Sequence, residues 1–249
     1  MYFNNKKDLI CFLKTKNYLG CGSQGTCFLD LNTNIVYKVF NQFLDEDYDE
    51  DEYIEYSKDD IMRYSHLVNN TFIFPKDVII VNDVVVGYIT DFVKAIHLNC
   101  VSNLCINLDN FSKGIEIANK DIKFLSDNNI TLFDVVYNLL YDEVNDRFYV
   151  TDCDEFGRGL DDLNYDEYNF KNFNSEIYWF LIDGYFNEFI DDHRDLSKMY
   201  KEKGPNYLEF LRLFRKYLSE YLDKDIKYLY QAKKVRNKKR CEPIYMRNV

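Results

Sequence analysis

Proline, glycine and tryptophan are scarce in this chain of 249 residues, which contains three Pro, nine Gly and one Trp. So few Pro and Gly residues leave no stretch with the composition of a linker, and the sequence has no internal repeat. The chain also lacks an apolar run of the roughly 18 residues that span a bilayer, and its polar start, Met1 to Lys7, is not followed by a secretory core. We therefore expect a cytoplasmic protein that does not enter a membrane.

Metal-site and disulfide patterns are missing as well. The seven cysteines are odd in number and scattered, with no Cys-x-x-Cys pair and no His ligand nearby. We expect reduced thiols. Hydrophobic residues make up 47% of the chain and charged residues 29%, which is typical of a folded globular protein.

The net charge of −11 argues against general nucleic-acid binding, because a negative protein repels the phosphate backbone. Two segments are strongly charged. Residues 45–60 carry ten acidic residues and one Lys, and residues 224–240 carry eight basic residues and one Asp. Only the basic 224–240 segment offers a route to nucleic acid, and a solvated surface is the alternative for both segments.

The first third of the chain has the pattern of a small sheet with one helix. Five short runs rich in β-branched and aromatic residues predict strands at Tyr18–Leu19, Thr26–Leu31, Ile35–Phe40, Val78–Asn82 and Val84–Thr90. Between the third and fourth runs, residues 53–68 have apolar residues at helical spacing.

The remainder is mostly helical. Apolar spacing predicts a helix from Leu108 to Leu125, and further helices at 175–190 and 207–222. A strand pair, Asn138–Tyr141 and Arg147–Thr151, is predicted as a hairpin across the polar residues 142–146.

The segment Gly20-Cys21-Gly22-Ser23-Gln24-Gly25 contains the pattern G-x-G-x-x-G between two predicted strands. Glycine suits a phosphate loop, because backbone N–H groups can approach an anion closely where no side chain intervenes. The dinucleotide-binding version of this motif is followed by a helix, whereas here a strand follows. The pattern alone is a weak signal.

Thirteen residues after Gly25, Lys38 lies in the apolar run Val36-Tyr37-Lys38-Val39-Phe40. A Lys in a buried strand is costly unless it has an anionic partner. Snorkelling of Lys38 from an edge strand is the alternative.

Asn138 and Asp152 stand fourteen residues apart, on either side of the predicted hairpin. An amide and a carboxylate oxygen are the hard ligands that Mg²⁺ bridging ATP phosphates prefers. These residues could instead be a strand cap and a turn residue.

Together the glycine segment, Lys38 and the stretch from Ile130 to Asp152 resemble the protein-kinase-like superfamily over roughly residues 18–154. The resemblance implies an α+β, two-lobed fold: an N-terminal lobe, 1–91, with an antiparallel sheet and one helix, and a mostly helical C-terminal lobe, 92–249. It implies ATP and Mg²⁺ as cofactors.

The resemblance also implies roles for single residues. The glycine segment with Ser23 and Gln24, together with Lys38 and Asp91, is implied to bind the nucleotide, and Asn138 and Asp152 the metal. Asp60, which is followed by apolar residues in the register of the family's helix, is the expected partner of Lys38, with Glu55 as its competitor. Asp134 is the expected catalytic base.

The sequence departs from the family at several positions. Asp134 precedes Asn138 by four positions instead of five, Leu132 and Phe133 replace the usual His and Arg, and the usual Asp-Phe-Gly is Asp152-Cys153-Asp154. The tetrapeptide His193-Arg194-Asp195-Leu196 imitates the catalytic motif but lies after the metal pair, so we expect only a loop or a helix start there.

The leading hypothesis is a phosphotransferase that moves the ATP γ-phosphate to a hydroxyl, on Ser or Thr of an unknown protein. Two alternatives remain open. One is a pseudokinase that binds a partner in a nucleotide-dependent manner, and the other is a kinase with a small-molecule acceptor.

Overall fold

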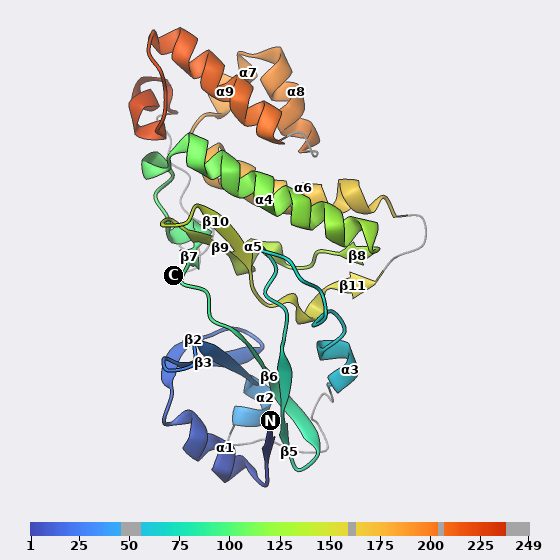
Figure 1. The fold of residues 1–249 in the computed structure, drawn as a ribbon. Helices are drawn as coiled ribbons and strands as arrows, with labels where there is room; N and C mark the ends of the chain where they lie inside the picture. Colours follow the sequence, from blue (N-terminus) through green and yellow to red (C-terminus); the bar gives the residue numbers. More distant parts are fainter. Residues whose placement is uncertain (46–55, 159–162, 204–206, 238–249) are drawn as a thin grey trace. The chain divides into compact units, whose positions relative to one another are not determined.

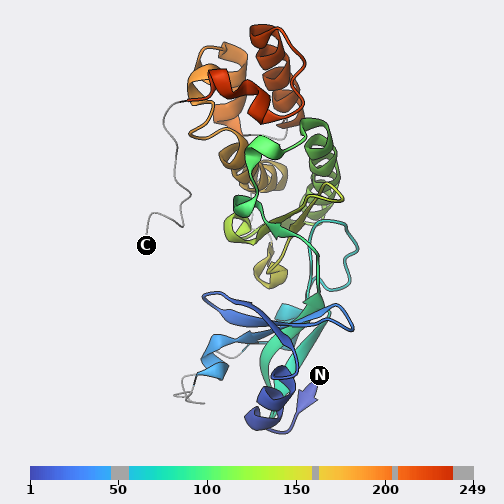
Figure 2. The same ribbon diagram turned by 90° about the vertical axis from the view of Figure 1, so that its left-hand side faces the viewer.

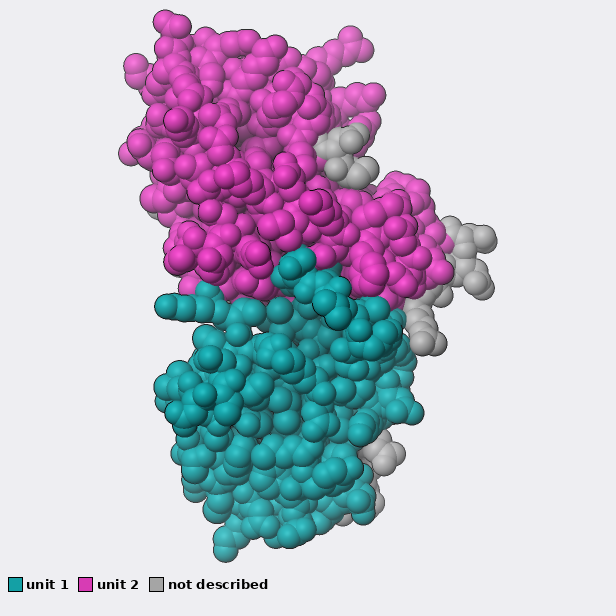
Figure 3. Space-filling view, in the orientation of Figure 1, with its two compact units in different colours: residues 1–94, 151–155 teal, residues 95–150, 156–249 magenta. Residues whose placement is uncertain are grey.

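The computed structural model describes residues 1–45, 56–158, 163–203 and 207–237 (Figure 1). The chain divides into two compact units (Figure 3). Unit 1 consists of residues 1–94 and 151–155, and unit 2 of residues 95–150 and 156–249. The first boundary therefore falls three residues after the expected position of 91, and a short later segment returns to unit 1.

A six-stranded sheet forms the centre of unit 1, in the strand order β1-β5-β6-β4-β3-β2. All five predicted strands are present. The strands are β1 (Tyr2–Phe3), β2 (Asn17–Cys21), β3 (Gly25–Asp30), β4 (Ile35–Phe40), β5 (Asp77–Val81) and β6 (Val84–Asp91). The expectation of a purely antiparallel sheet was wrong at one edge, because β1 pairs in parallel with β5. Two residues are too short for a strand pattern to be visible in sequence.

The described residues of unit 1 form the helices α1 (Lys6–Leu13), α2 (Asn41–Leu44) and α3 (Lys58–Ile61), and residues 153–155 form the 3₁₀ helix η4 (Cys153–Glu155). Asn5 caps α1 by accepting a hydrogen bond from the backbone N–H of Asp8 at 2.9 Å. The helix predicted over 53–68 was too long at its C-terminal end, since α3 ends at Ile61. Its first part, 53–55, lies outside the described residues.

Two apolar clusters pack on the sheet, and the side chains of β4 alternate between them. Tyr37 and Val39 join Leu9 and Leu13 of α1, whereas Phe40 joins the cluster that contains Tyr88. Because successive strand residues point to opposite faces, Lys38 shares the face of Phe40. Lys38 is directly opposite Tyr88 in the β4–β6 pairing.

In unit 2, the long helices α4 (Leu108–Asp127) and α6 (Tyr165–Leu181) lie side by side (Figures 1 and 2). Helix α4 packs on the predicted hairpin, which forms as β9 (Leu139–Asp142) and β10 (Arg147–Val150). The strand β7 (Ile96–His97) extends this hairpin, and β8 (Ile130–Thr131) pairs with β11 (Gly157–Arg158). The short helix α5 (Val135–Asn138) precedes β9.

The last part of unit 2 contains α7 (Asn187–Asp191), α8 (Arg194–Glu202) and α9 (Tyr207–Leu222). The described residues of unit 2 also form the 3₁₀ helices η2 (Leu98–Cys100) and η3 (Asn103–Cys105) near its start and η5 (Leu229–Val235) near its end. The prediction for 207–222 is confirmed, whereas the helix predicted over 175–190 is interrupted between α6 and α7, where Gly184 has a φ of 73°. Helix α8 begins at Arg194, so the decoy tetrapeptide is a helix start as predicted. Within the described ranges, no helix is long and apolar enough to cross a membrane.

Candidate functional site

Lys38 is the centre of the candidate site, which lies wholly in unit 1. Its side chain is almost fully buried, with 6% of the residue exposed, and its ammonium forms an ion pair with the carboxylate of Asp152. The same ammonium lies over the ring of Tyr88, 5.2 Å from the ring centroid. Lys38 therefore does not snorkel to solvent, and the strand holds a buried cation next to an anion.

Asp152 and Asp154 converge on the hydroxyl of Tyr88. The Tyr88 oxygen lies 2.6 Å from Asp152 Oδ1 and 2.9 Å from Asp154 Oδ1. The backbone of Asp152 has a φ of 62°, in the left-handed region that few residues other than glycine adopt. Such strain is usually retained where the surrounding contacts require one geometry.

The charged groups of this cluster shift one another's pKa values. Burial lowers the pKa of Lys38, but the charges of Asp152 and Asp154 outweigh it, so the pKa lies above its ordinary value. Burial likewise acts to raise the pKa of Asp152, whereas Lys38 lowers it, and the net pKa lies below the ordinary value. For Asp154, burial raises the pKa to about 6, against Lys38 and with the help of the Asp152 charge. Asp152 is thus the ionised partner of Lys38.

The glycine segment joins β2 to β3, and its turn is closed by a hydrogen bond of 2.9 Å from Gly22 N to Gly25 O. Glycine is needed at position 25 because of a neighbouring side chain: a Cβ there would lie 3.0 Å from Cγ and Cε of Lys38. The absence of a side chain at Gly25 therefore lets the Lys38 stem pass. Gly20 and Gly22 have no such requirement: a Cβ at Gly20 would meet nothing within 4 Å, and one at Gly22 only Gly25 O at 3.9 Å.

Ser23 and Gln24 form the exposed tip of this segment. The side-chain amide of Gln24 donates to the carboxylate of Glu155, which follows the Asp152 to Asp154 stretch. The tip is therefore tied to the same returning segment that supplies Asp152.

The expected partnership of Lys38 with Asp60 was wrong. Asp60 is 63% exposed by side chain and pairs with Arg63, three residues further along. The short α3 begins at its cap Ser57 and places Asp60 in the first turn, where it faces a local cation. Glu55, the competitor, lies outside the described residues.

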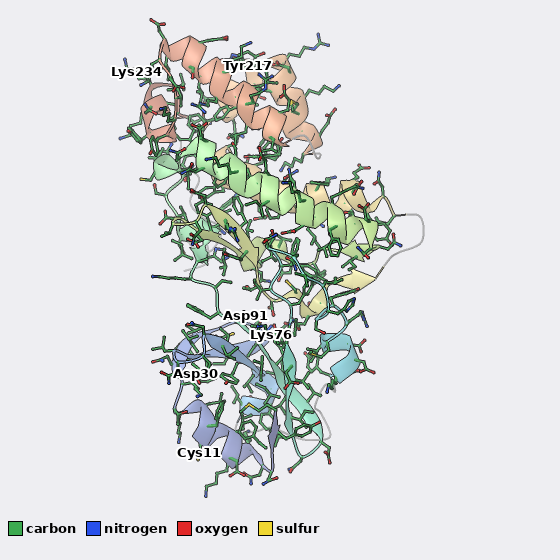
Figure 4. The ribbon with its side chains drawn as sticks, viewed as in Figure 1. Cys11, Asp30, Lys76, Asp91, Tyr217 and Lys234 are labelled. Carbon is green, nitrogen blue, oxygen red and sulfur yellow. The ribbon has the colours of Figure 1, made fainter. Side chains whose placement is uncertain are left out.

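Asp91, the remaining expected nucleotide contact, lies at the end of β6 and forms an ion pair of 2.6 Å with Lys76 (Figure 4). About half of each side chain is exposed, at 54% for Lys76 and 49% for Asp91. Asp91 is thus part of unit 1 but is separate in its contacts from the Lys38 cluster.

Asp134 and Asn138, the expected base and metal ligand, lie in unit 2 on a single turn of chain. The amide of Asn138 donates to the backbone carbonyl of Asp134 at 3.0 Å across α5. Asp134 is exposed and has a φ of 44°. The structure therefore brings these two residues together, and Asp134, like Asp152, has a left-handed backbone conformation.

Glu176 on α6 is a partly buried carboxylate that the sequence did not indicate. Burial raises its pKa to about 7, opposed by Lys203 and reinforced by the charges of Asp134 and Asp183. The expected base therefore has an acidic neighbour on a helix that packs against α5.

Sequence reasoning missed three contributors in unit 1: Tyr88, Asp154 and Asn41. Asp154 could have been recognised from the sequence, as the second carboxylate of Asp152-Cys153-Asp154. The apolar surroundings of Tyr88 made it look like an ordinary core residue. Asn41 follows the Lys38 strand directly and contacts the glycine segment, which only the folded hairpin reveals.

Within the described part of the chain, no group of three or more His, Cys, Asp and Glu side chains is arranged to hold a metal ion. The sequence matches none of the protein-family models and none of the curated proteins with which it was compared.

Proposed function

We propose that this chain is an ATP-dependent phosphotransferase of the protein-kinase-like class, which transfers the γ-phosphate to a hydroxyl on protein Ser or Thr. The observation that carries the proposal is the buried ion pair of Lys38 and Asp152, with the Lys38 stem passing the glycine segment at Gly25. A buried ion pair adds little to the free energy of unfolding, because the cost of removing two charges from water is about as large as their mutual attraction. A buried cation next to a glycine segment has a clear use, however, in holding anionic phosphates.

The residues of unit 1 suit a nucleotide and its Mg²⁺. Nothing in the described protein requires glycine at 20 or 22, so a ligand that approaches the backbone closely accounts for these two positions. Asp152 offers the ionised carboxylate oxygens that Mg²⁺ prefers, and water and phosphate oxygens complete such sites in other proteins. Bound Mg·ATP supplies the transferable phosphoryl group, and Lys38 is placed to hold its negative charge.

In this proposal, Asn138 is the second metal ligand and Asp134 orients the acceptor. The exposed position of Asp134 supports that role, because an acceptor hydroxyl must reach the carboxylate. Asp134 accepts the proton of that hydroxyl as the hydroxyl oxygen bonds to the γ-phosphorus, while the bond from this phosphorus to the β,γ-bridging oxygen breaks and ADP leaves.

A pseudokinase is the second candidate, and the shortened spacing of Asp134 and Asn138 favours it. Asn138 donates its amide to the backbone carbonyl of Asp134, so its amide nitrogen is engaged within the protein. In that case the same Lys38 cluster binds nucleotide as a structural ligand and no transfer takes place. A third candidate, a kinase with a small-molecule acceptor, differs from the first only in what Asp134 orients.

Calorimetry with Mg·ATP tests the shared part of these functions. We expect saturable binding and an increase in thermal stability, about 2.7 kcal/mol at a hundredfold excess over Kd. Asp152→Asn should weaken both, whereas Asp30→Asn, a carboxylate in an ion pair with Lys16 elsewhere in unit 1, should retain them. If the wild type gives neither heat nor a thermal shift, the nucleotide proposal fails.

Transfer is tested separately with γ-labelled ATP and Mg²⁺, with the chain alone and in a lysate. Label on a protein supports the protein kinase, and label on a small molecule supports a small-molecule acceptor. Binding without any transfer favours the pseudokinase.

A further inference from the structure

Asn41 makes contacts with the glycine segment along its whole tip. This residue is the first of α2 and lies three positions after Lys38 on the same chain segment. Its side-chain amide nitrogen donates to Gly22 O at 2.8 Å and to Ser23 O at 3.2 Å, and its backbone N–H donates to Gln24 O at 2.9 Å. Three consecutive carbonyls of the segment are therefore held by one residue.

The amide of Asn41 is itself fixed in orientation. Thr26, at the start of β3, donates its hydroxyl to Asn41 Oδ1 at 2.9 Å. Because the oxygen accepts from Thr26, the NH₂ group faces the segment, and the roles of the two amide atoms are determined by their partners. Asn41 thus links β3, β4 and the glycine segment.

This arrangement determines where the N–H groups of the tip point. In a trans peptide the carbonyl of one residue and the N–H of the next point in opposite directions, and the described chain has no cis peptide. With the carbonyls of Gly22 and Ser23 facing Asn41, the N–H groups of Ser23 and Gln24 face away from it. Among the described residues, neither N–H has a hydrogen-bond acceptor. Two successive N–H groups that face away from Asn41 can together donate hydrogen bonds to an anion.

We propose that Asn41 is the positioning residue that directs the Ser23 and Gln24 N–H groups to the phosphates of the nucleotide. The inference rests on the proposed function of the Lys38 site. It assigns to Asn41 no contact with the ligand, since its polar atoms are occupied by the loop and by Thr26. Loss of Asn41 should therefore weaken recognition of phosphate and leave recognition of the nucleoside unchanged.

The test compares Mg·ATP, ADP and adenosine by isothermal titration calorimetry. For Asn41→Ala we expect affinity for ATP and ADP to fall roughly tenfold, equivalent to about one hydrogen-bonded anchor, with adenosine affinity unchanged. Thr26→Val, which keeps the shape of the side chain but frees Asn41 Oδ1, should give a smaller loss of the same kind. Asn5→Ala is the matched control, because it removes an Asn cap elsewhere in unit 1. It should leave all three affinities unchanged.

The possible failures are distinguishable. If the wild type binds no ATP, the proposed function fails and takes this inference with it. If the wild type binds ATP and Asn41→Ala binds it equally well, the role of Asn41 is excluded while the proposed function stands. Equal losses for ATP and adenosine would show a general structural defect, which also excludes phosphate positioning. Should Asn41→Ala fail to fold, the ATP-to-adenosine affinity ratio of Thr26→Val decides the question.

Discussion

The Tyr88 hydroxyl and Asp152 Oδ1 lie 2.6 Å apart, and the ammonium of Lys38 on the neighbouring strand lies over the Tyr88 ring. Tyr88 therefore contacts both charges of the central ion pair: its hydroxyl contacts the carboxylate of Asp152, and its ring contacts the ammonium of Lys38. Burial raises the pKa of Tyr88 well above its ordinary value, with the charges of Asp154 and Asp152 adding to the effect. The phenol thus remains a hydrogen-bond donor at any physiological pH.

We expect Tyr88→Phe to lower the free energy of unfolding by about 1–2 kcal/mol, because two partly buried carboxylates lose their shared donor. Urea denaturation measures this change. Tyr37→Phe is the control, since Tyr37 lies on the opposite face of the sheet, and it should change stability by less than half as much. Equal losses would show that the hydroxyl of Tyr88 has no special role.

Lys38→Met should lower the free energy of unfolding by about 2–4 kcal/mol, because Asp152 would remain largely buried without its cation. The matched change Lys76→Met breaks a half-exposed ion pair with Asp91 and should lose at most about 1 kcal/mol. Adding Asp152→Leu to Lys38→Met should recover part of the loss. A double variant that is less stable than the sum of the single changes would contradict the pairing.

The raised pKa of Glu176 predicts that the free energy of unfolding depends on pH. Its pKa is raised from 4.5 to about 7, so between these values the native chain holds a proton that the unfolded chain releases. The stabilising effect of the neutral form is complete below pH 4.5 and is lost as the pH rises through 7. Glu176→Gln should therefore raise the free energy of unfolding by about 1–3 kcal/mol at pH 8 and change it little at pH 4. A uniform effect at both pH values would disprove the raised pKa.

Asp134→Asn should reduce phosphate transfer at least about a hundredfold while leaving ATP affinity nearly unchanged, since a general base acts in the transition state. The measurement is single-turnover transfer from γ-labelled ATP beside a binding titration. Asp127→Asn, which alters a surface carboxylate paired with Lys123, is the control and should retain activity. Wild-type turnover in Asp134→Asn would remove this residue from the mechanism.

The sheet and the hairpin were predictable because their signals are local. β4 begins at Ile35 and ends at Phe40, as its run of β-branched and aromatic residues indicates. The hairpin of β9 and β10 and the long helices α4 and α9 follow in the same way from short-range apolar spacing. Strand β1 has only two residues and owes its place to pairing with β5, so no local pattern marks it.

Partners of charged groups were not predictable. Lys38 needed an anion, which the burial of its strand makes clear, but the anion is Asp152, 114 residues away in sequence. The spacing of apolar residues after Asp60 suggested Asp60 instead. Such spacing describes positions within one helix and does not show which distant residues a side chain contacts. The contacts of Asn41 and Tyr88 likewise depend on strand pairing. Pairing brings together side chains whose distance in the sequence gives no sign that they meet.

Unit 1 is discontinuous, since residues 151–155 complete a body otherwise made by residues 1–94. During synthesis on a ribosome, the strand that bears Lys38 emerges long before the carboxylate that neutralises it. The nascent sheet must therefore keep this ammonium in contact with water until residue 155 has left the exit tunnel. A fragment that ends at residue 94 would retain all six strands of the sheet but would lack Asp152, the anionic partner of Lys38.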